Sequence, residues 1–487
     1  MNTRGSRPTT LLILLCLAGA LLVALLVSQF GSFGGWDSQG LPTANRTLNQ
    51  FTAVMVTCIA LIVPLTSNLY TPRLVRLYVT HPLLVAGLAV LLLSHVLSLS
   101  INFFPVGHPI HGVLVAAIST CFLVVMGGAL PFLYGISQFL RPSYFMPMLT
   151  RKGVADLKAL RSDRGRDDDY FLTVDVLTNL ALTGMQRGDR QLVLLALEAF
   201  HVLLLETIAA GVAHPDLWTR IRPRFVPGLA REGQDYLVRE GIWPEGYLLA
   251  QTLKVLEASN RQQHEIVAEL ASQLVETCEL AVGFGRETIV ELHVMAFNTL
   301  CREAVEQKDL RRFQNLSYHY RLLVEALRDL PGRMHEATQN LIHYGRVAHR
   351  ERLHFGFETV IYDLGELILS LGRSRESAAV ELLELWVGPL WQESLEDPVL
   401  KKVALRALIR TYWEVRVLGL QTLSQAIFWR YLSDAQVHRE RLEVLLEENR
   451  ELHFEFNDRL MRFAHFSTGA VEEAQRFLLE RDEAEAY

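Results

Sequence analysis

The alternation of apolar and polar residues divides the chain into two parts. Four long apolar stretches, none of which contains Asp, Glu, Lys or Arg, lie within the first 140 residues. From Tyr170 onward, apolar residues instead recur about every 3.6 positions, and short polar turns interrupt them. The pattern therefore predicts an uncharged apolar part followed by a part made of amphipathic helices.

The four apolar stretches predict four transmembrane helices, because a helix needs roughly 20 residues to cross the core of a bilayer. They are Leu11–Ser28, Phe51–Tyr70, Leu83–Ile101 and Val113–Leu140. The first follows two arginines, as a signal peptide would, but its apolar run is long and no small-residue cleavage site follows it. We therefore interpret the first stretch as a retained anchor.

The placement of basic residues predicts the orientation of these spans. Basic residues precede the first span, separate the second from the third and follow the fourth, at Arg4, Arg7, Arg73, Arg76, Arg141, Arg151 and Lys152. Lys and Arg concentrate in the short cytoplasmic loops of membrane proteins. We therefore expect a multi-pass protein of the cell inner (plasma) membrane, with the lipid bilayer as a partner and both termini in the cytoplasm.

A row of polar residues lies on one face of the third predicted span. Ser94, Ser98 and Asn102 recur every fourth residue, and His95 lies beside them. One interpretation of this candidate intramembrane polar face is a pore lining with a proton-responsive histidine. The other is a set of hydrogen bonds between helices, which we favour because no span contains a charged partner.

The second part of the chain predicts an all-α domain. Helical periods of about 15–20 residues are separated by short polar turns, such as Gly188-Asp189 and Lys308-Asp309. Helices joined in this way pack as antiparallel pairs. No fixed repeat period and no named repeat consensus is present. We therefore expect an all-α fold, with a four-helix transmembrane segment followed by an irregular, α-solenoid-like helical array.

Charge follows the same division of the chain. Residues 1–150 carry six Arg and one acid, Asp37, whereas residues 151–487 carry 41 basic and 52 acidic side chains, a net charge of −11. This balance excludes a disordered chain and a basic nucleic-acid binder, so no nucleic-acid partner is expected. The predicted domains are a transmembrane domain at 1–145, a charged linker at 146–169 and a helical cytoplasmic domain at 170–487. Six Lys against 41 Arg favours a bacterial source.

One segment of the helical part breaks the regular pattern. His214–Tyr247 is rich in proline and aromatic residues, and its candidate interaction residues are Trp218, Arg220, Arg222, Arg224 and Phe225. Pro223 and Pro227 favour an extended chain, which would project the three arginines to one side. The resulting positive strip could bind anionic headgroups or a carboxylate-rich partner. In the alternative interpretation, the arginines pair with the domain's own acids and the aromatic residues pack on neighbouring helices.

The sequence contains no complete catalytic motif, so no enzyme activity and no cofactor are expected. The densest group of metal-ligating types is His335, Glu336, His343, His349 and His354. His335 and His343 are eight residues apart on a predicted helix, too far to hold one metal ion without another helix. The five cysteines show no spacing typical of zinc sites or disulfide frameworks, so no metal site is predicted.

Two short stretches carry a resemblance to known sequences. His343–Ala348 (HYGRVA) and Leu353–Leu364 (LHFGFETVIYDL) resemble a group of uncharacterised bacterial membrane proteins with N-terminal spans and a helical cytoplasmic region. The resemblance extends from about residue 335 through the C-terminal helices. It implies a bacterial inner-membrane setting and supplies no catalytic residues. Four polar residues lie within it: Tyr344, Arg346, Glu358 and Asp363. One interpretation is that they form a buried Arg–carboxylate network, and the other is that they contact a ligand.

Together these features predict an integral membrane protein that acts as a membrane-anchored cytoplasmic interaction or scaffold module. Its helical domain would bind a protein partner. The alternative is an oligomeric channel or transporter gated by the helical domain, which requires the chain to form a homo-oligomer and which the polar face motivates. An enzyme acting on a lipid is a third alternative, supported only by the scattered histidines.

Overall fold

The computed structural model describes residues 41–69, 82–100, 103, 109–138, 141–162, 167–226, 228–258, 264–432, 442–447, 449 and 466–485. All regular elements among these residues are helices, which confirms the all-α prediction. The chain forms two compact units, residues 1–199 and 200–487, and each is described by itself. No observation tests the predicted domain boundaries. Residues 146–161 of the expected linker lie in a helix.

The N-terminal unit contains five helices and the first half of a sixth in its described part: α2 (Leu41–Leu69), α4 (Pro82–Ser100), α5 (Pro109–Gln138), α6 (Pro142–Arg161), α7 (Asp167–Arg187) and α8 (Arg190–Ala213). Helices α2, α4 and α5 pack around one apolar cluster made of Leu48, Met55, Leu84, Leu91, Val125 and Phe132. The ring of Phe132 lies so close to Gly87 that a Cβ there would be 2.3 Å from it. The close approach of α4 and α5 therefore depends on glycine.

The prediction of four transmembrane spans is not supported. Among the described residues, one helix is long and apolar enough to cross a membrane, and it is α8, outside the four predicted stretches. More than half of its most apolar window is buried inside the protein, as in the core helix of a globular domain. The apolar parts of α4 and α5 that the structure describes, Leu84–Ser100 and Ala117–Ala129, are shorter than the roughly 20 residues that a crossing requires. The first predicted span lies outside the described residues.

This finding corrects the predicted function. An integral membrane protein, whether a membrane-anchored module or a gated channel or transporter, required the four spans, and the described helices do not provide them. The predicted inner-membrane location, its topology and the bilayer as a partner also depended on these spans, and no observation tests them.

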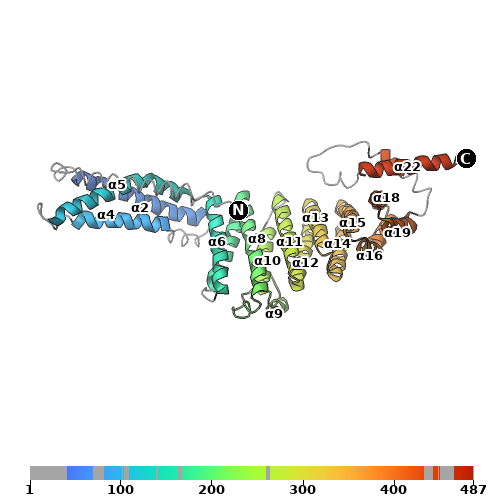
Figure 1. Ribbon diagram of the computed structural model, residues 1–487, viewed down its shortest axis with the longest axis horizontal. Helices are drawn as coiled ribbons and strands as arrows, with labels where there is room; N and C mark the ends of the chain where they lie inside the picture. The colour runs from blue at the N-terminus through green and yellow to red at the C-terminus, as the bar shows by residue number, and fades with distance from the viewer. Residues whose placement is uncertain are drawn as a thin grey trace. The chain divides into compact units, whose positions relative to one another are not determined.

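The C-terminal unit is a helical array with two layers. One layer contains α11 (His264–Gly283), α13 (Leu310–Ala326), α15 (His354–Ser374) and α18 (Lys401–Val417), each packed against the next. The other contains α10 (Trp243–Glu257), α12 (Glu287–Glu306) and α14 (Pro331–Arg350), which also contact one another in order. Successive helices from α11 to α15 pack side by side (Figure 1). This arrangement confirms the prediction of a repeat-like helical array.

Shorter elements complete the C-terminal unit. Helix α9 precedes the array, and α16, a π-helical turn η3, α17, α19 and α22 follow α15 or flank α18. Their bounds are Arg231–Arg239 (α9), Glu376–Leu382 (α16), Leu383–Val387 (η3), Gly388–Glu396 (α17), Gln421–Tyr431 (α19) and Thr468–Glu485 (α22).

One turn geometry recurs between helices along the chain. A residue with positive φ ends a helix, and the next helix begins two residues later, at Gly188, Gly241, Gly285, Lys308, Arg352 and Gly419. At Lys308, the backbone N–H donates to Val305 O at 3.0 Å and the following N–H, of Asp309, donates to Ala304 O at 2.9 Å. These two bonds define a Schellman motif, which satisfies the last carbonyls of the helix. The polar turns read from the sequence are therefore helix caps.

Lys308 and Arg352 adopt this left-handed conformation without being glycine, at φ 52° and 64°. We expect Lys308→Gly and Arg352→Gly each to raise the free energy of unfolding by about 1 kcal/mol, because a Cβ is unfavourable at positive φ. Urea denaturation measures the change, read as a shift of the midpoint at constant slope. Arg302→Gly, inside α12, is the matched control and should instead destabilise by about 1 kcal/mol. Destabilisation by both cap variants would contradict the expectation.

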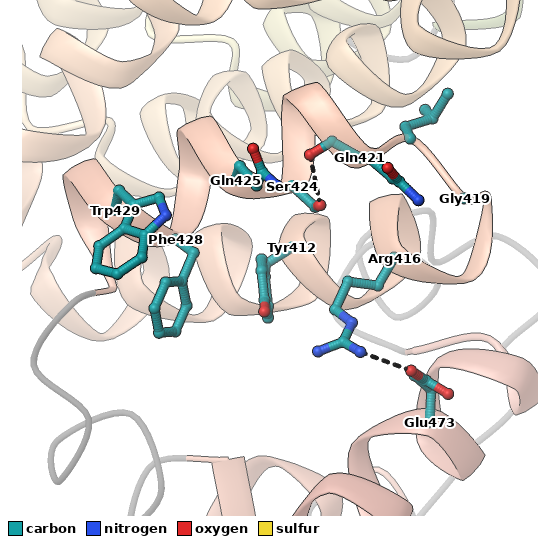
Figure 2. A pocket seen from close by; sticks show the side chains of 10 residues that line it. Tyr412, Arg416, Gly419, Gln421, Ser424, Gln425, Phe428, Trp429 and Glu473 are labelled. Atoms are coloured by element: carbon teal, nitrogen blue, oxygen red, sulfur yellow. Dashed lines mark hydrogen bonds and ion pairs between the residues drawn. The ribbon is translucent and has the colours of Figure 1, made fainter.

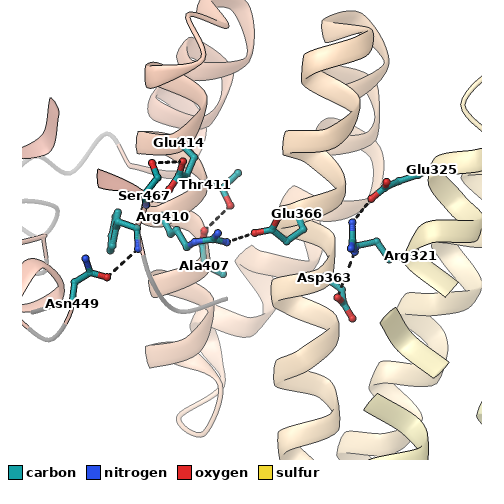
Figure 3. Close-up of polar contacts among 11 residues, drawn as sticks. Arg321, Glu325, Asp363, Glu366, Ala407, Arg410, Thr411, Glu414, Asn449 and Ser467 are labelled. Carbon is teal, nitrogen blue, oxygen red and sulfur yellow. Dashed lines mark hydrogen bonds and ion pairs between the residues drawn. The ribbon is translucent and has the colours of Figure 1, made fainter. Parts of the chain in front are cut away.

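Polar contacts also join the helices of the first layer. Arg321 of α13 pairs with Glu325 and lies 3.6 Å from the carboxylate of Asp363 on α15 (Figure 3). One turn further along α15, Glu366 accepts a 2.5 Å hydrogen bond from Arg410 of α18. Charged pairs thus connect three successive helices of one layer, in addition to their apolar packing.

Candidate interaction loop

The segment between α8 and α9 contains the interaction residues predicted from the sequence. We call residues 214–226 the Arg loop. Helix α8 ends at Ala213, and Pro215 and Pro223 prevent the helix from continuing, because proline lacks a backbone N–H. Residues 215–219 form turns, and Arg222–Val226 has no regular secondary structure. Pro227 lies outside the described residues.

The first end of the Arg loop is anchored in the core by two tryptophans. Trp218 is only 2% exposed, and its ring packs edge-to-face on Trp243, with ring centroids 6.4 Å apart. The indole N–H of Trp243 donates to the backbone oxygen of Trp218 at 3.2 Å. The structure therefore places Trp218 in the core, where it fixes the loop and does not face solvent.

The second end of the Arg loop is held by Gln234 of α9. The side-chain amide of Gln234 donates to the backbone oxygens of Val226 and Leu229, both at 3.2 Å, and its oxygen accepts the N–H of Val226 at 3.4 Å. Val226 itself is buried. Both ends of the loop are thus fixed by side chains that bond to its backbone.

Between these two ends, the other predicted residues reach the surface. Arg220 and Arg222 are exposed, Arg224 is half-buried, and Phe225 is 72% exposed. In the part of the chain that the structure describes, neither Arg220 nor Arg222 forms an ion pair with an acid. Among the described residues, the loop therefore presents two guanidinium groups without an ion pair and an exposed aromatic ring.

A buried acid lies beneath the loop. Glu245, in the first turn of α10, is fully buried, and neither of its carboxyl oxygens has a hydrogen-bond partner in another described residue. Burial raises the pKa of Glu245 to about 7, against smaller opposing effects of its own backbone N–H and of the charge on Arg286. A Cβ on Gly211 would lie 3.0 Å from the indole nitrogen of Trp218 and 3.3 Å from Oε1 of Glu245, so glycine permits this close packing. A carboxyl group whose ionisation is disfavoured by burial therefore packs beside Trp218.

The candidate polar face of the third predicted span lies on α4. Ser94 is buried and donates to the backbone oxygen of Val90 at 2.7 Å, and Nε2 of His95 lies 2.9 Å from the hydroxyl of Thr52 on α2. Ser98 is half-buried, and Asn102 lies outside the described residues. The His95–Thr52 contact is the kind of bond between helices that the favoured interpretation requires.

The histidines singled out in the sequence do not form one cluster. Nε2 of His349 contacts Asp397 at 3.0 Å, and Nδ1 of His349 contacts Nδ1 of His354 at 3.0 Å. His335 lies 3.8 Å from Glu381 instead, and the ring of His343 packs against Tyr344. Within the described ranges, no three metal-ligating side chains come close enough to hold a metal ion.

The polar residues of the resemblance are likewise separated. Asp363 is fully buried and accepts a 2.5 Å hydrogen bond from the hydroxyl of Ser317, whereas Arg346 pairs with Glu393 at the surface. Burial raises the pKa of Glu358 and of Tyr344 above their ordinary values. Asp363 thus belongs to a buried network with Arg321, and Arg346 lies outside it.

A pocket at the C-terminal end of the array was not predicted from the sequence. It lies between α18, α19 and α22 and includes Arg416, Trp429 and Glu473. Glu473 is 57 residues from Arg416, so no local pattern connects the two. The single signal available in the sequence was the pair Phe428-Trp429, two large aromatic residues followed by Arg430.

Comparisons with known proteins add little to this geometry. No family model matches the chain, and no curated protein matches it. Among solved structures, the chain is similar to a "Circular tandem repeat protein with novel repeat topology and enhanced subunit contact surfaces", at 13% identity and a TM-score of 0.35, over 83% of this chain and 100% of that one. A similarity this low supports no argument about function. No comparison bears on the resemblance to bacterial membrane proteins, which stays a prediction.

Proposed function

We propose that this protein is an interaction module, in which a helical array presents the Arg loop to an acidic protein partner. The observation that supports the proposal is the loop itself: it carries two exposed arginines that form no ion pair with a described residue and a 72% exposed Phe225, and it is held between buried anchors. Arg and aromatic residues are enriched at protein–protein interfaces and among the residues that contribute most to binding.

The electrostatics favour an acidic partner. Residues 151–487 carry a net charge of −11, so arginines that could pair within the domain have many acids available. Arg220 and Arg222 nevertheless have no such pair among the described residues. A guanidinium group binds a carboxylate through two parallel hydrogen bonds, which suits a partner rich in Asp and Glu.

The fixed backbone of the Arg loop also favours binding. A loop that is already ordered loses less conformational entropy when its partner binds. Here the bonds from Trp243 to Trp218 and from Gln234 to Val226 fix the backbone on both sides of the arginines. The helical array behind the loop supplies the rigid support that scaffold proteins of this architecture provide.

The test is the triple variant Arg220→Gln, Arg222→Gln and Arg224→Gln in the full chain. Each surface ion pair contributes about 0.2–1 kcal/mol, so we expect the three substitutions together to weaken binding to a Glu-rich 12-residue peptide roughly tenfold. Fluorescence anisotropy of the labelled peptide measures the Kd. Because the side chains reach the surface, the melting temperature should change little.

The control variant removes three positive charges from a part of the array outside the Arg loop. Arg302, Arg328 and Arg373 are exposed residues of the array outside the Arg loop, and their triple Gln variant should bind the peptide like the wild type. An Arg-loop variant that binds normally but melts at a much lower temperature would make the arginines structural. Binding to phosphatidylserine vesicles in preference to the acidic peptide would replace the protein partner by a membrane surface.

A further inference from the structure

A pocket lies near the C-terminal end of the helical array. Helices α18, α19 and α22 enclose a pocket of about 370 Å³, within the size range of ligand sites. We call it the C-terminal pocket. Its lining residues come from all three helices, and Figure 2 shows Arg416 and Glu473 at one side and the aromatic residues at the other.

The chain builds this pocket through two local features. Gly419, at φ 71°, reverses the chain between α18 and α19, so that α19 packs along α18. Glu414 of α18 then accepts hydrogen bonds from the backbone N–H and the hydroxyl of Ser467, at 2.6 and 2.9 Å, just before α22 begins. These bonds fix the start of α22, and one turn later Glu473 lies opposite Arg416.

One side of the pocket carries the ion pair between Arg416 and Glu473. Nη2 of Arg416 donates to Glu473 at 2.9 Å, but Glu473 also pairs with Arg476 at 3.2 Å. Two guanidinium groups therefore share one carboxylate. The side chain of Arg416 is 35% exposed, and its Nη1 and Nε have no acceptor among the described residues. The guanidinium carbon of Arg416 lies 5.2 Å from the centroid of the Trp413 ring and forms a cation–π contact with it.

The opposite side of the pocket is aromatic and exposed. Trp429 is 71% exposed, and Phe428 packs on the ring of Tyr412 with centroids 5.8 Å apart. Gln421 and Gln425, one turn apart on α19, add two exposed side-chain amides to the lining. The lining thus offers an aromatic surface, a guanidinium group with donors that its partner Glu473 does not use, and two amides that match the hydrogen-bonding atoms of a peptide backbone.

We propose that the C-terminal pocket binds a peptide segment that presents a carboxylate to Arg416 and an adjacent aromatic side chain to Phe428 and Trp429. Arg416 selects the carboxylate, because the guanidinium donors that Glu473 leaves unused can form charge-assisted hydrogen bonds with it. Aromatic rings stack favourably in offset or edge-to-face geometry, which the exposed face of Trp429 allows. The carboxylate can be the C-terminus of the peptide or an acidic side chain. This site is independent of the Arg loop.

Three short peptides and the full-length protein test the proposal by fluorescence anisotropy. Acetyl-Gly-Gly-Gly-Phe with a free C-terminus and acetyl-Gly-Gly-Glu-Phe-amide carry the two forms of the carboxylate, and acetyl-Gly-Gly-Gln-Phe-amide carries neither. We expect saturable binding of at least one carboxylate peptide and at least roughly tenfold weaker binding of the neutral one. The stronger of the first two identifies the source of the carboxylate.

The variants are Arg416→Gln and Trp429→Ala, each expected to weaken binding about tenfold. Trp429 is exposed, so its removal should leave the fold intact even if Arg416→Gln loosens α22. Arg430→Gln is the matched control: Arg430 pairs with Glu384 at 3.1 Å and does not line the pocket, so its loss should leave the Kd unchanged.

The proposal is overturned if neither carboxylate peptide binds saturably, if the neutral peptide binds equally well, or if Trp429→Ala binds like the wild type. The triple variant of the Arg loop separates the two sites. It should bind these short peptides normally, and Arg416→Gln should bind the Glu-rich peptide normally. A negative result at one site therefore does not affect the test of the other site.

Discussion

Replacing Asp363 by alanine is expected to lower the free energy of unfolding by about 2 kcal/mol, because the buried hydroxyl of Ser317 loses its acceptor and Arg321 keeps Glu325 as its remaining carboxylate partner. Asp363 is fully buried on α15, where it accepts the hydroxyl of Ser317 and faces Arg321, which is 11% exposed. Alanine would leave both groups of α13 without this acceptor. Urea denaturation of the full chain, followed by circular dichroism, measures the loss.

Two further substitutions separate the charge of Asp363 from its hydrogen bond. Asp363→Asn keeps an acceptor for Ser317 and removes the charge, so it should cost less than alanine. Glu393→Ala is the surface control: it removes the partner of Arg346, and both side chains are about half exposed, so the cost should stay within about 1 kcal/mol. If Asp363→Ala costs no more than this control, the network between α13 and α15 does not hold the layer together.

Stability should fall as pH rises from about 4.5 to about 7, because of Glu245. Its folded-state pKa, about 7, lies above the value near 4.5 that the carboxyl group has when unfolded. The folded chain therefore binds a proton that the unfolded chain releases, so the contribution is fully present below about pH 4.5 and is lost as pH rises to about 7. A shift of this size corresponds to about 3 kcal/mol, since each pKa unit is worth 1.36 kcal/mol.

Glu245→Gln removes this ionisation and keeps the size of the side chain. We expect the variant and the wild type to have similar stability near pH 4.5, and the variant to be more stable at pH 8 by up to about 3 kcal/mol. Urea denaturation across this pH range measures the difference. Burial lowers the pKa of His293 from 6.5 to about 4, so this residue changes the stability with pH only under acidic conditions. A difference between variant and wild type that does not change with pH would contradict the assignment to Glu245.

Part of the Arg loop could be predicted from the sequence. The prolines and arginines of residues 214–226 predicted an irregular positive segment, and the structure places Arg220, Arg222 and Phe225 at the surface. Trp218 was grouped with them, but it is buried because Trp243, 25 residues later, lies within reach of its backbone. Hydrophobicity and spacing do not distinguish an aromatic residue that binds a partner from one that anchors a loop.

The membrane prediction failed for a related reason. Helix α8 is as apolar as a membrane span, yet it lies in the fold as a largely buried helix. In contrast, the apolar parts of α4 and α5 that the structure describes are shorter than the runs from which spans were predicted. Composition shows how apolar a segment is. It does not show whether the segment is buried against other helices or exposed to lipid, because both environments remove apolar side chains from water.

The sequence alone determined the all-helical character of the chain and most of the turns between helices of the array, because these depend on residues a few positions apart. Periodic apolar residues specify each helix, and a residue that accepts positive φ, such as Gly285 or Gly419, ends it. Only the tertiary structure decided what depends on distant residues: the burial of Glu245 and Trp218, the pairing of Asp363 with Arg321, and the pocket between Arg416 and Glu473. The physical reason is that desolvation and ion pairing act between neighbours in space, and local periodicity does not say which helices become neighbours.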